Sequence, residues 1–215
     1  MQDKKPGLLI VLSGPSGVGK GTVCAGLLAQ DDNATYSVSA TTRKKRPNEV
    51  EGKSYFFVNE AQFSQMAHRG EFLEYTRVFS EYSYGTPKKY VFEQLEQGKD
   101  VILEIDVQGG LQVKEVYEGA VLIFVAPPSM DELKRRLVGR GTESEEAIVR
   151  RTQAAYQEMQ CISLYDYVVI NDTVESALEG ITAIMHAEKS RVSRREDLVS
   201  LLLGGMDSYD ELSWR

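Results

Sequence analysis

A glycine-rich stretch near the start of the chain has the spacing of a phosphate-binding loop. It follows the apolar run Leu8–Leu12, precedes residues with helical spacing, and reads Gly14-Pro15-Ser16-Gly17-Val18-Gly19-Lys20-Gly21-Thr22. This order of strand, loop and helix is the context that a Walker A loop requires. Glycines let several backbone N–H groups converge on one anion, the helix start adds partial positive charge, and the lysine adds a full one. The stretch therefore predicts a site for nucleotide phosphates.

One position departs from the strict form of this loop, in which Ser or Thr directly follows the lysine. Gly21 stands there, and Thr22 comes next. Thr22 is the remaining hydroxyl that can reach a phosphate, so the departure bears on how the loop handles Mg²⁺.

A second candidate anion site is the basic run Arg43-Lys44-Lys45-Arg46. In a chain of net charge −7, this run indicates either an anionic ligand or a solvated basic loop. An aromatic-rich segment downstream carries the hydrogen-bonding side chains Tyr55, Glu74, Tyr84 and Thr86. A buried carboxylate would accept two N–H groups from the edge of guanine, a pair that adenine does not offer. Taken alone, these residues are also typical of an ordinary protein surface.

Other kinds of chemistry fit the sequence less well. Asp106-Val-Gln-Gly109 matches the DxxG pattern of GTPases, but the guanine-reading NKxD motif is absent from the sequence, which disfavours a GTPase. The two histidines disfavour a His-based metal site, and the two cysteines, Cys24 and Cys161, form no CxxC pair. A sequence pI near 5.1 argues against general nucleic-acid binding. No apolar run approaches the roughly 20 residues of a membrane span. We therefore expect a cytoplasmic protein that binds neither nucleic acid nor membranes.

The elements that must position these residues follow an alternating pattern. Buried strands are predicted at four apolar runs, Leu8–Leu12, Val101–Ile105, Val121–Val125 and Tyr167–Ile170. Continuous apolar runs suit strands that are covered on both faces, and helical patterns lie between them. The sequence therefore predicts an α/β fold, with a parallel-sheet P-loop core and helices on both faces of the sheet.

Two smaller pieces are expected to interrupt this core, which takes residues 1–34, 81–138 and 152–190. Residues 35–80 predict a small mixed insertion of antiparallel strands and one short helix over Glu60–Arg69. Residues 139–151 are charged, contain glycine and predict a mobile lid. Residues 191–215 predict a C-terminal extension, with a helical part and a frayed tail.

Further segments follow one another along the chain: Ser37–Phe57, Gly70–Tyr75, Tyr84–Thr86, Leu103–Gly109, Ala126–Ser129, Gly139–Thr142 and Val169–Asp172. In this order they closely resemble guanylate kinases, a family of P-loop nucleoside monophosphate kinases. The resemblance runs from about residue 7 to 188 and is reinforced by the phosphate loop. The variant Gly21-Thr22 is similar to the loop of adenylate kinases.

The resemblance implies that the insertion binds GMP. The residues implied are Ser39 for the base, Arg43, Arg46, Tyr55 and Tyr84 for the phosphate, Glu74 for guanine N1 and N2, and Thr86 near O6. Glu104, at a position where relatives often have Asp, and Asp106, near the reacting phosphates and Mg²⁺, complete this set.

The resemblance also implies an ATP site. It would comprise the loop Gly14–Thr22, the arginines Arg136, Arg140 and Arg151 of the ATP side and its lid, and Asn171 near the adenine. Mg²⁺ would be held mainly by the nucleotide phosphates and water, near Thr22 and Asp106. The residues implied in catalysis are Lys20, Arg43, Asp106, Arg136, Arg140 and Arg151.

The implied activity is transfer of the γ-phosphoryl group of ATP to GMP, with dGMP as a further acceptor, and a homodimer is compatible with it. Two alternatives stay open at this point. One is a kinase for a different nucleoside monophosphate, against which Glu74 and Thr86 speak. The other is a guanylate-kinase-like module that binds a phosphorylated peptide, against which the intact Lys20 loop speaks.

Overall fold

The computed structural model describes residues 5–78, 82–138 and 145–204. Its core is a parallel sheet with strand order β2-β7-β1-β8-β9. These strands are β1 (Leu9–Ser13), β2 (Ala34–Tyr36), β7 (Asp100–Glu104), β8 (Val121–Ala126) and β9 (Tyr167–Ile170). The four strands predicted from apolar runs are confirmed, with ends that differ by one residue at most. The edge strand β2 was not predicted as part of this sheet, because it is short, carries no apolar run and is only partly buried.

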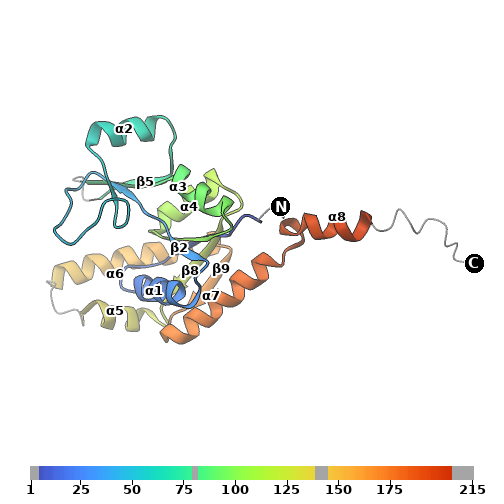
Figure 1. Ribbon diagram of the computed structural model, residues 1–215. Coiled ribbons are helices and arrows are strands. Elements are labelled where there is room, and N and C mark those ends of the chain that lie inside the picture. Colours follow the sequence, from blue (N-terminus) through green and yellow to red (C-terminus); the bar gives the residue numbers. More distant parts are fainter. Residues whose placement is uncertain (1–4, 79–81, 139–144, 205–215) are drawn as a thin grey trace, which may run out of the picture.

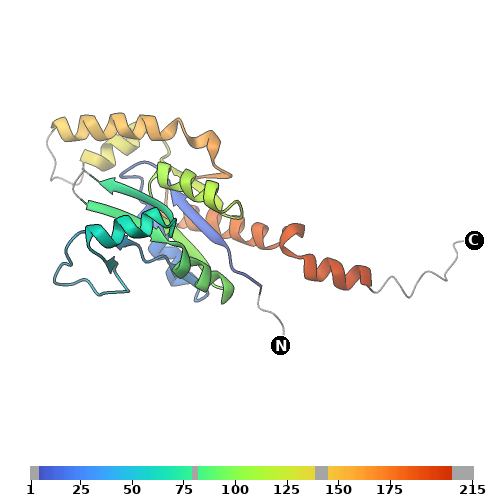
Figure 2. The same ribbon diagram turned by 90° about the horizontal axis from the view of Figure 1, so that it is seen from above.

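Helices cover both faces of the sheet, as predicted (Figures 1 and 2). Alternate residues of β1 point to opposite faces. Leu8, Ile10 and Leu12 pack in a cluster with residues of α1 (Lys20–Gln30), α5 (Met130–Val138) and α7 (Val174–Lys189). Leu9 and Val11 pack with residues of α3 (Lys88–Glu96) and α4 (Val107–Val116). Burial of apolar side chains on both faces is what holds the strand ends, and the loops that follow them, in fixed positions.

The insertion is built around a second, smaller sheet with strand order β4-β3-β6-β5. Its strands are β3 (Ala40–Thr41), β4 (Phe56–Phe57), β5 (Phe72–Val78) and β6 (Tyr82–Pro87). The pairs β3–β6 and β5–β6 are antiparallel, as expected, but β3 and β4 are parallel, because the long segment between them returns the chain to the same end. Strand β6 lies beyond residue 80, where we expected the insertion to end.

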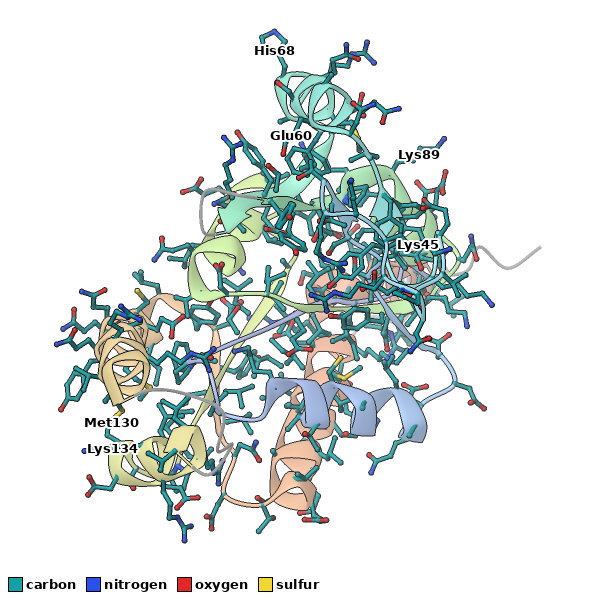
Figure 3. All side chains as sticks on the ribbon, turned by 90° about the vertical axis from the view of Figure 1, so that its left-hand side faces the viewer. Lys45, Glu60, His68, Lys89, Met130 and Lys134 are labelled. Carbon is teal, nitrogen blue, oxygen red and sulfur yellow. The ribbon has the colours of Figure 1, made fainter. Side chains whose placement is uncertain are left out.

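Helix α2 (Glu60–His68) covers this small sheet through Phe63, which stacks on Phe72 at 4.6 Å between ring centroids. The helix begins with a capping box between Asn59 and Gln62, which fixes its first turn. In Figure 3, Glu60 and His68 mark the insertion at one end of the molecule, and Met130 and Lys134 mark α5 at the other. The edge that carries the candidate site lies between these two ends.

The last described elements lead away from the core. Helix α6 (Glu145–Met159) and the short turn η1 (Ile162–Leu164) return the chain to β9. After α7, the turn η2 (Val192–Arg194) leads into α8 (Glu196–Gly204), which projects from the body (Figure 1). The expected lid over 139–151 lies partly outside the described residues, and its second half begins α6. In the described parts of the chain, no helix is both long and apolar enough to cross a membrane.

Candidate functional site

The candidate site lies at the edge where the parallel strands of the core end. β1 runs directly into the loop that begins at Gly14, β7 ends at Glu104, and β9 is followed by Asn171. The carboxyl ends of parallel strands share one edge of a sheet, and ligands of α/β proteins bind there. The topology therefore brings together residues that lie as much as about 150 positions apart in the sequence.

The glycines of the phosphate loop are required by its backbone. Gly14, Gly17 and Gly19 have φ of 149°, 88° and 99°, a region that favours glycine. A Cβ at Gly14 would lie 2.1 Å from the carbonyl oxygen of Val125 on the neighbouring strand. The loop can therefore fold only because these positions carry no side chain.

Helix α1 starts from this loop with its first turn prepared for an anion. Its N-cap residue, Gly19, makes no side-chain hydrogen bond to the backbone N–H groups of the first turn, and that turn contains no acidic residue. Lys20 is the first residue of the helix, and its Nζ donates to the carbonyl oxygens of Gly14 at 2.6 Å and Pro15 at 3.3 Å. The lysine is thus folded back over the loop, where its charge adds to that of the helix start.

Three carboxylates act on this lysine. Burial lowers the pKa of Lys20, while the charges of Glu158, Glu104 and Asp106 raise it. Asp106 also has a structural task, because its side chain caps α4 by accepting from the Gly109 N–H at 2.7 Å. Sequence analysis did not identify Glu158, which comes from α6, far along the chain.

The opposite side of the phosphate loop is held by Asn171 and Arg136. The side-chain amide of Asn171 donates to the Val18 carbonyl oxygen at 2.8 Å, and its backbone carbonyl accepts from Arg136 at 3.0 Å. Arg136 Nε also donates to Glu132 at 2.8 Å. Both residues expected on the ATP side therefore lie at the loop. Arg151 lies half-buried on α6, and Arg140 falls outside the described residues.

A small polar cavity of about 200 Å³ opens between the core and the insertion. It is lined by Tyr36, Ser39, Ser54, Tyr55, Glu74, Thr76, Tyr84, Glu104, Ile105 and Asp106. Six of these residues were predicted from the sequence as site residues. Tyr36, Ser54, Thr76 and Ile105 were not, because nothing in their local pattern distinguishes them from other strand and loop residues.

Glu74, which lines this cavity, forms a buried pair with Thr86. The hydroxyl of Thr86 donates to Glu74 Oε1 at 2.7 Å. Thr86 is 0% exposed and Glu74 is 6% exposed. Burial raises the pKa of Glu74 to about 7, with the Asp106 charge acting in the same direction and Thr86 opposing it. The second oxygen, Oε2, lies 3.2 Å from where a Cβ would stand on Gly109, so α4 packs closely against the carboxylate.

The basic run of the insertion is organised around a glutamate that sequence analysis missed. Arg43 is paired with Glu49 at 2.6 and 3.1 Å, and Glu49 also accepts from the Arg46 backbone N–H at 2.8 Å. The guanidinium of Arg43 lies 5.4 Å from the centre of the Tyr55 ring. The hydrogen bonds that Arg43 makes with Glu49 and Tyr84 raise its pKa further, so this side chain is a permanent cation near the cavity.

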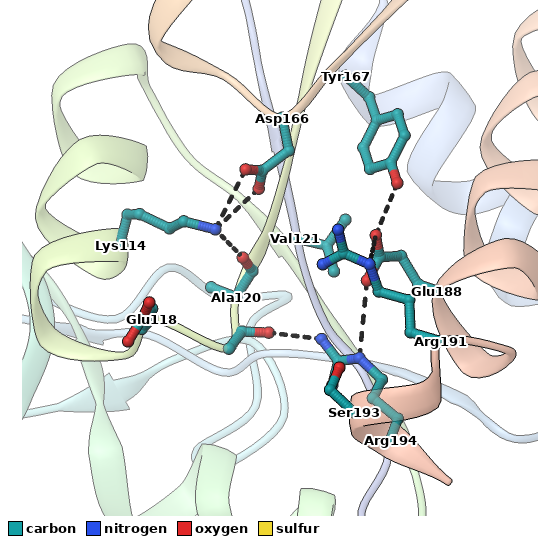
Figure 4. A pocket seen from close by; sticks show the side chains of 11 residues that line it. Lys114, Glu118, Ala120, Val121, Asp166, Tyr167, Glu188, Arg191, Ser193 and Arg194 are labelled. Carbon is teal, nitrogen blue, oxygen red and sulfur yellow. Dashed lines mark hydrogen bonds and ion pairs between the residues drawn. The ribbon is translucent and has the colours of Figure 1, made fainter.

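A larger cavity of about 470 Å³ lies at the other edge of the sheet, where β8 and β9 begin (Figure 4). It is lined by charges of both signs that already pair with one another. Lys114 pairs with Asp166 at 2.9 Å, and the buried Glu188 accepts from the Tyr167 hydroxyl at 2.6 Å. Because its charges balance and none of the sequence motifs reaches it, this cavity is not the candidate site.

Comparison with known proteins agrees with this geometry. The family model described as guanylate kinase matches residues 7–188. A guanylate kinase of Caldanaerobacter subterraneus subsp. tengcongensis is 54% identical over 198 residues, which is 92% of this chain and 96% of that protein. A guanylate kinase of Clostridium tetani is 52% identical over 200 residues, or 93% and 95% of the two chains. The crystal structure of guanylate kinase from Anaplasma phagocytophilum superposes with a TM-score of 0.70 at 35% identity, covering 92% of this chain and 95% of that chain.

Proposed function

The chain belongs to the guanylate kinase family, which transfers a phosphoryl group from ATP to GMP and gives ADP and GDP, and from this premise we propose how its residues divide the work. The phosphate loop binds ATP, and the cavity lined by Glu74, with Thr86 bonded to it, selects guanine. The observation that carries the proposal is the buried Glu74–Thr86 pair, because Glu74 lines the same cavity as Glu104 and Asp106 of the core.

Guanine is selected by the number of donors on its edge. Glu74, when ionised, accepts from guanine N1–H and the N2 amino group, while Thr86 lies near O6 and Ser39 contacts the base. Adenine would leave the buried carboxylate without donors, and an unpaired buried polar group costs about 1–3 kcal/mol, or more when it is charged. The site therefore rejects the wrong base by leaving its own groups unsatisfied.

The phosphate of GMP is held by Arg43, Arg46, Tyr55 and Tyr84. In the free protein Arg43 is occupied by Glu49. The guanidinium has five N–H donors in a fork, so it keeps this partner while presenting further donors to a phosphate. Glu49 thus keeps the arginine oriented before GMP arrives.

The ATP phosphates lie in the loop Gly14–Thr22, with Lys20 turning from the loop carbonyls toward the β- and γ-phosphates. Asn171 and Arg136 brace the loop from the adenine side. Arg136 and Arg151, together with Arg140, neutralise charge that builds up on the transferring group. We retain 139–151 as the proposed lid, whose closure would keep water from the reacting phosphates.

The residues present fit a divalent cation that arrives with the nucleotide. The oxygen-bearing side chains near Lys20, among them Thr22 and Asp106, are of the kind that Mg²⁺ prefers. Within the described residues, no three His, Cys, Asp or Glu side chains are grouped as a ready-made metal site. Bound with the nucleotide, Mg²⁺ would supply charge neutralisation, and the protein's part is to align the donor and acceptor nucleotides.

The remaining expectations are also proposals. dGMP is a second acceptor, because none of the contacts assigned above uses the ribose. A cytoplasmic location is supported by the two cysteines, which are both free thiols. A homodimer would be detected by sedimentation of the purified protein.

Base selection is tested with Glu74→Gln, assayed with GMP and with IMP, which lacks the N2 amino group. We expect kcat/KM for GMP to fall on the order of 10³-fold, and the preference for GMP over IMP to fall at least about tenfold. Glu71→Gln, an exposed neighbour on the same insertion, is the matched control and should behave as the unmodified protein. An unchanged GMP to IMP ratio in Glu74→Gln would remove Glu74 from base recognition.

A further inference from the structure

Helix α4 begins on a sequence motif that the proposed function uses only in part, Asp106-Val-Gln-Gly109. Asp106 is the N-cap of the helix, and Gly109 is buried in its first turn. Gly109 is not among the glycines with a positive φ, so its backbone conformation suits any residue. A glycine also lowers the stability of a helix relative to alanine. The backbone therefore gives no reason for a glycine here, and the reason has to lie in its surroundings.

The surroundings of Gly109 are two carboxylates and one aliphatic side chain. A Cβ built on it would lie 3.2 Å from Glu74 Oε2, 3.5 Å from Asp106 Oδ1 and 3.5 Å from Ile105 Cδ1. The two longer distances are ordinary contacts, whereas 3.2 Å is closer than Cβ atoms usually approach an oxygen. A side chain at residue 109 would therefore press on Glu74 alone.

Glu74 is held in place from the other side. Its Oε1 accepts from the Thr86 hydroxyl at 2.7 Å, and both residues are buried. The backbone N–H of Tyr75 donates to Gln112 Oε1 of α4 at 3.3 Å, which keeps the strand β5 against the helix. A side chain at residue 109 would thus displace Oε2 while Thr86 retains Oε1.

The two oxygens of Glu74 face different parts of the guanine edge in the proposed site. Along this edge O6, N1–H and the N2 amino group follow one another in that order. Thr86 is assigned to O6 and is bonded to Oε1, so Oε1 falls to N1–H and Oε2 to the N2 amino group. Hypoxanthine, the base of IMP, has the same edge without that amino group. The oxygen that Gly109 leaves room for is therefore the one that tells GMP from IMP.

We propose that Gly109 is a specificity-determining positioning residue, whose missing side chain lets Glu74 Oε2 lie where it binds the N2 amino group of GMP. The inference rests on the proposed role of Glu74 and deepens it. The N–H of the same residue holds Asp106 at 2.7 Å. Gly109 thus keeps the base-reading carboxylate and the carboxylate proposed near the reacting phosphates in a fixed relation.

The proposal is tested with Gly109→Ala, assayed with GMP and with IMP at saturating MgATP. We expect KM for GMP to rise about tenfold, which is the cost of weakening one hydrogen bond to a charged group. The rise for IMP should be much smaller, because IMP has no amino group opposite Oε2. The kcat with GMP and the affinity for a non-hydrolysable ATP analogue should stay unchanged, since the base is bound equally before and during transfer.

The matched control is Gly180→Ala in α7, another helical glycine. A Cβ at Gly180 would lie 3.5 Å or more from its neighbours, and both substitutions gain the same helix propensity. Gly180→Ala should keep the KM values of the unmodified protein for GMP and for IMP. An unchanged preference for GMP over IMP in Gly109→Ala would overturn the proposal.

A double-mutant cycle separates positioning of Glu74 from general damage to the site. Glu74→Asp withdraws the carboxylate from α4 by one methylene, so a methyl group at residue 109 no longer meets it. Adding Gly109→Ala to Glu74→Asp should therefore change the affinity for GMP little, although the same change costs about tenfold in the unmodified protein. Equal effects in the two backgrounds would contradict the proposed contact.

Two further outcomes are distinguished. If Gly109→Ala alone fails to fold, as judged by its unfolding curve, the comparison is made within Glu74→Asp, where Gly109→Ala should fold. Failure to fold there as well would show that neighbours other than Glu74 exclude the side chain, and it would overturn the proposal. An unchanged GMP to IMP ratio in Glu74→Gln is a different result, because it contradicts the proposed function itself.

Discussion

At the scale of single residues, the proposed recognition of guanine depends on the protonation state of Glu74. The neutral acid is favoured in the free protein because the side chain is buried, and its pKa rises to about 7. Guanine N1–H and N2–H are donors, so they bind the charged form. Binding of GMP must therefore draw the carboxyl group into its ionised state.

This leads to a pH dependence with a definite sign. Below pH 7 an increasing share of Glu74 carries a proton, so the affinity for GMP should fall, approaching about tenfold per pH unit well below the pKa. Calorimetric titration with GMP between pH 5.5 and about 8 measures this. The phosphate of GMP titrates in the same range, so the slope is compared with that of Glu74→Gln, which retains only the phosphate effect. Equal slopes in the two proteins would contradict the assignment.

At the scale of elements, the phosphate loop depends on close contact between β1 and β8. Gly14 combines a positive φ with a Cβ position that overlaps the Val125 carbonyl. Gly70 also has a positive φ, of 65°, but nothing lies within 4 Å of its Cβ position. Alanine substitutions at the two glycines therefore separate the cost of backbone strain, which both share, from the cost of steric overlap, which only Gly14 carries.

We expect Gly70→Ala to lower the free energy of unfolding by about 1 kcal/mol, and Gly14→Ala by at least about 2 kcal/mol more. Denaturant unfolding of both variants measures the difference. ATP binding should be lost in Gly14→Ala and retained in Gly70→Ala. Equal stabilities would mean that β1 and β8 can separate at this point without cost.

Several elements were predictable from the sequence because their signals are local. The four apolar runs became strands, since burial on both faces requires continuous apolar residues. Glycine spacing identified the phosphate loop, since its backbone conformation is itself a local property. The strand β2 carries no such signal, because an edge strand of this length is fixed by its pairing with β7.

The site was predictable only in part, for the same reason. Glu74 and Thr86 were found through the family resemblance, but their contact joins two strands and appears only after β5 and β6 pair. Glu49 and Glu158 were missed, because a glutamate on a polar segment looks the same whether or not it faces an arginine or lysine.

At the scale of the whole molecule, an acidic chain handles two anionic substrates by concentrating its cations. The net charge is −7, yet the phosphate loop and the Arg43–Arg46 run each present positive charge toward the edge between core and insertion. In the proposed arrangement, the core positions the donor nucleotide, and the insertion positions the acceptor nucleotide. Transfer between the two nucleotides follows from this division, because phosphoryl transfer needs mainly alignment and charge neutralisation.

The measurement that tests this account most directly is ADP formation from MgATP with GMP, AMP, UMP and CMP in parallel, with Lys20→Ala as the control. We expect turnover with GMP alone, and its loss by several orders of magnitude in Lys20→Ala, whose GMP binding should remain. Turnover with AMP or a pyrimidine nucleotide at a rate similar to that with GMP would contradict base selection by Glu74 and Thr86. Full activity in Lys20→Ala would contradict the assignment of the loop to ATP.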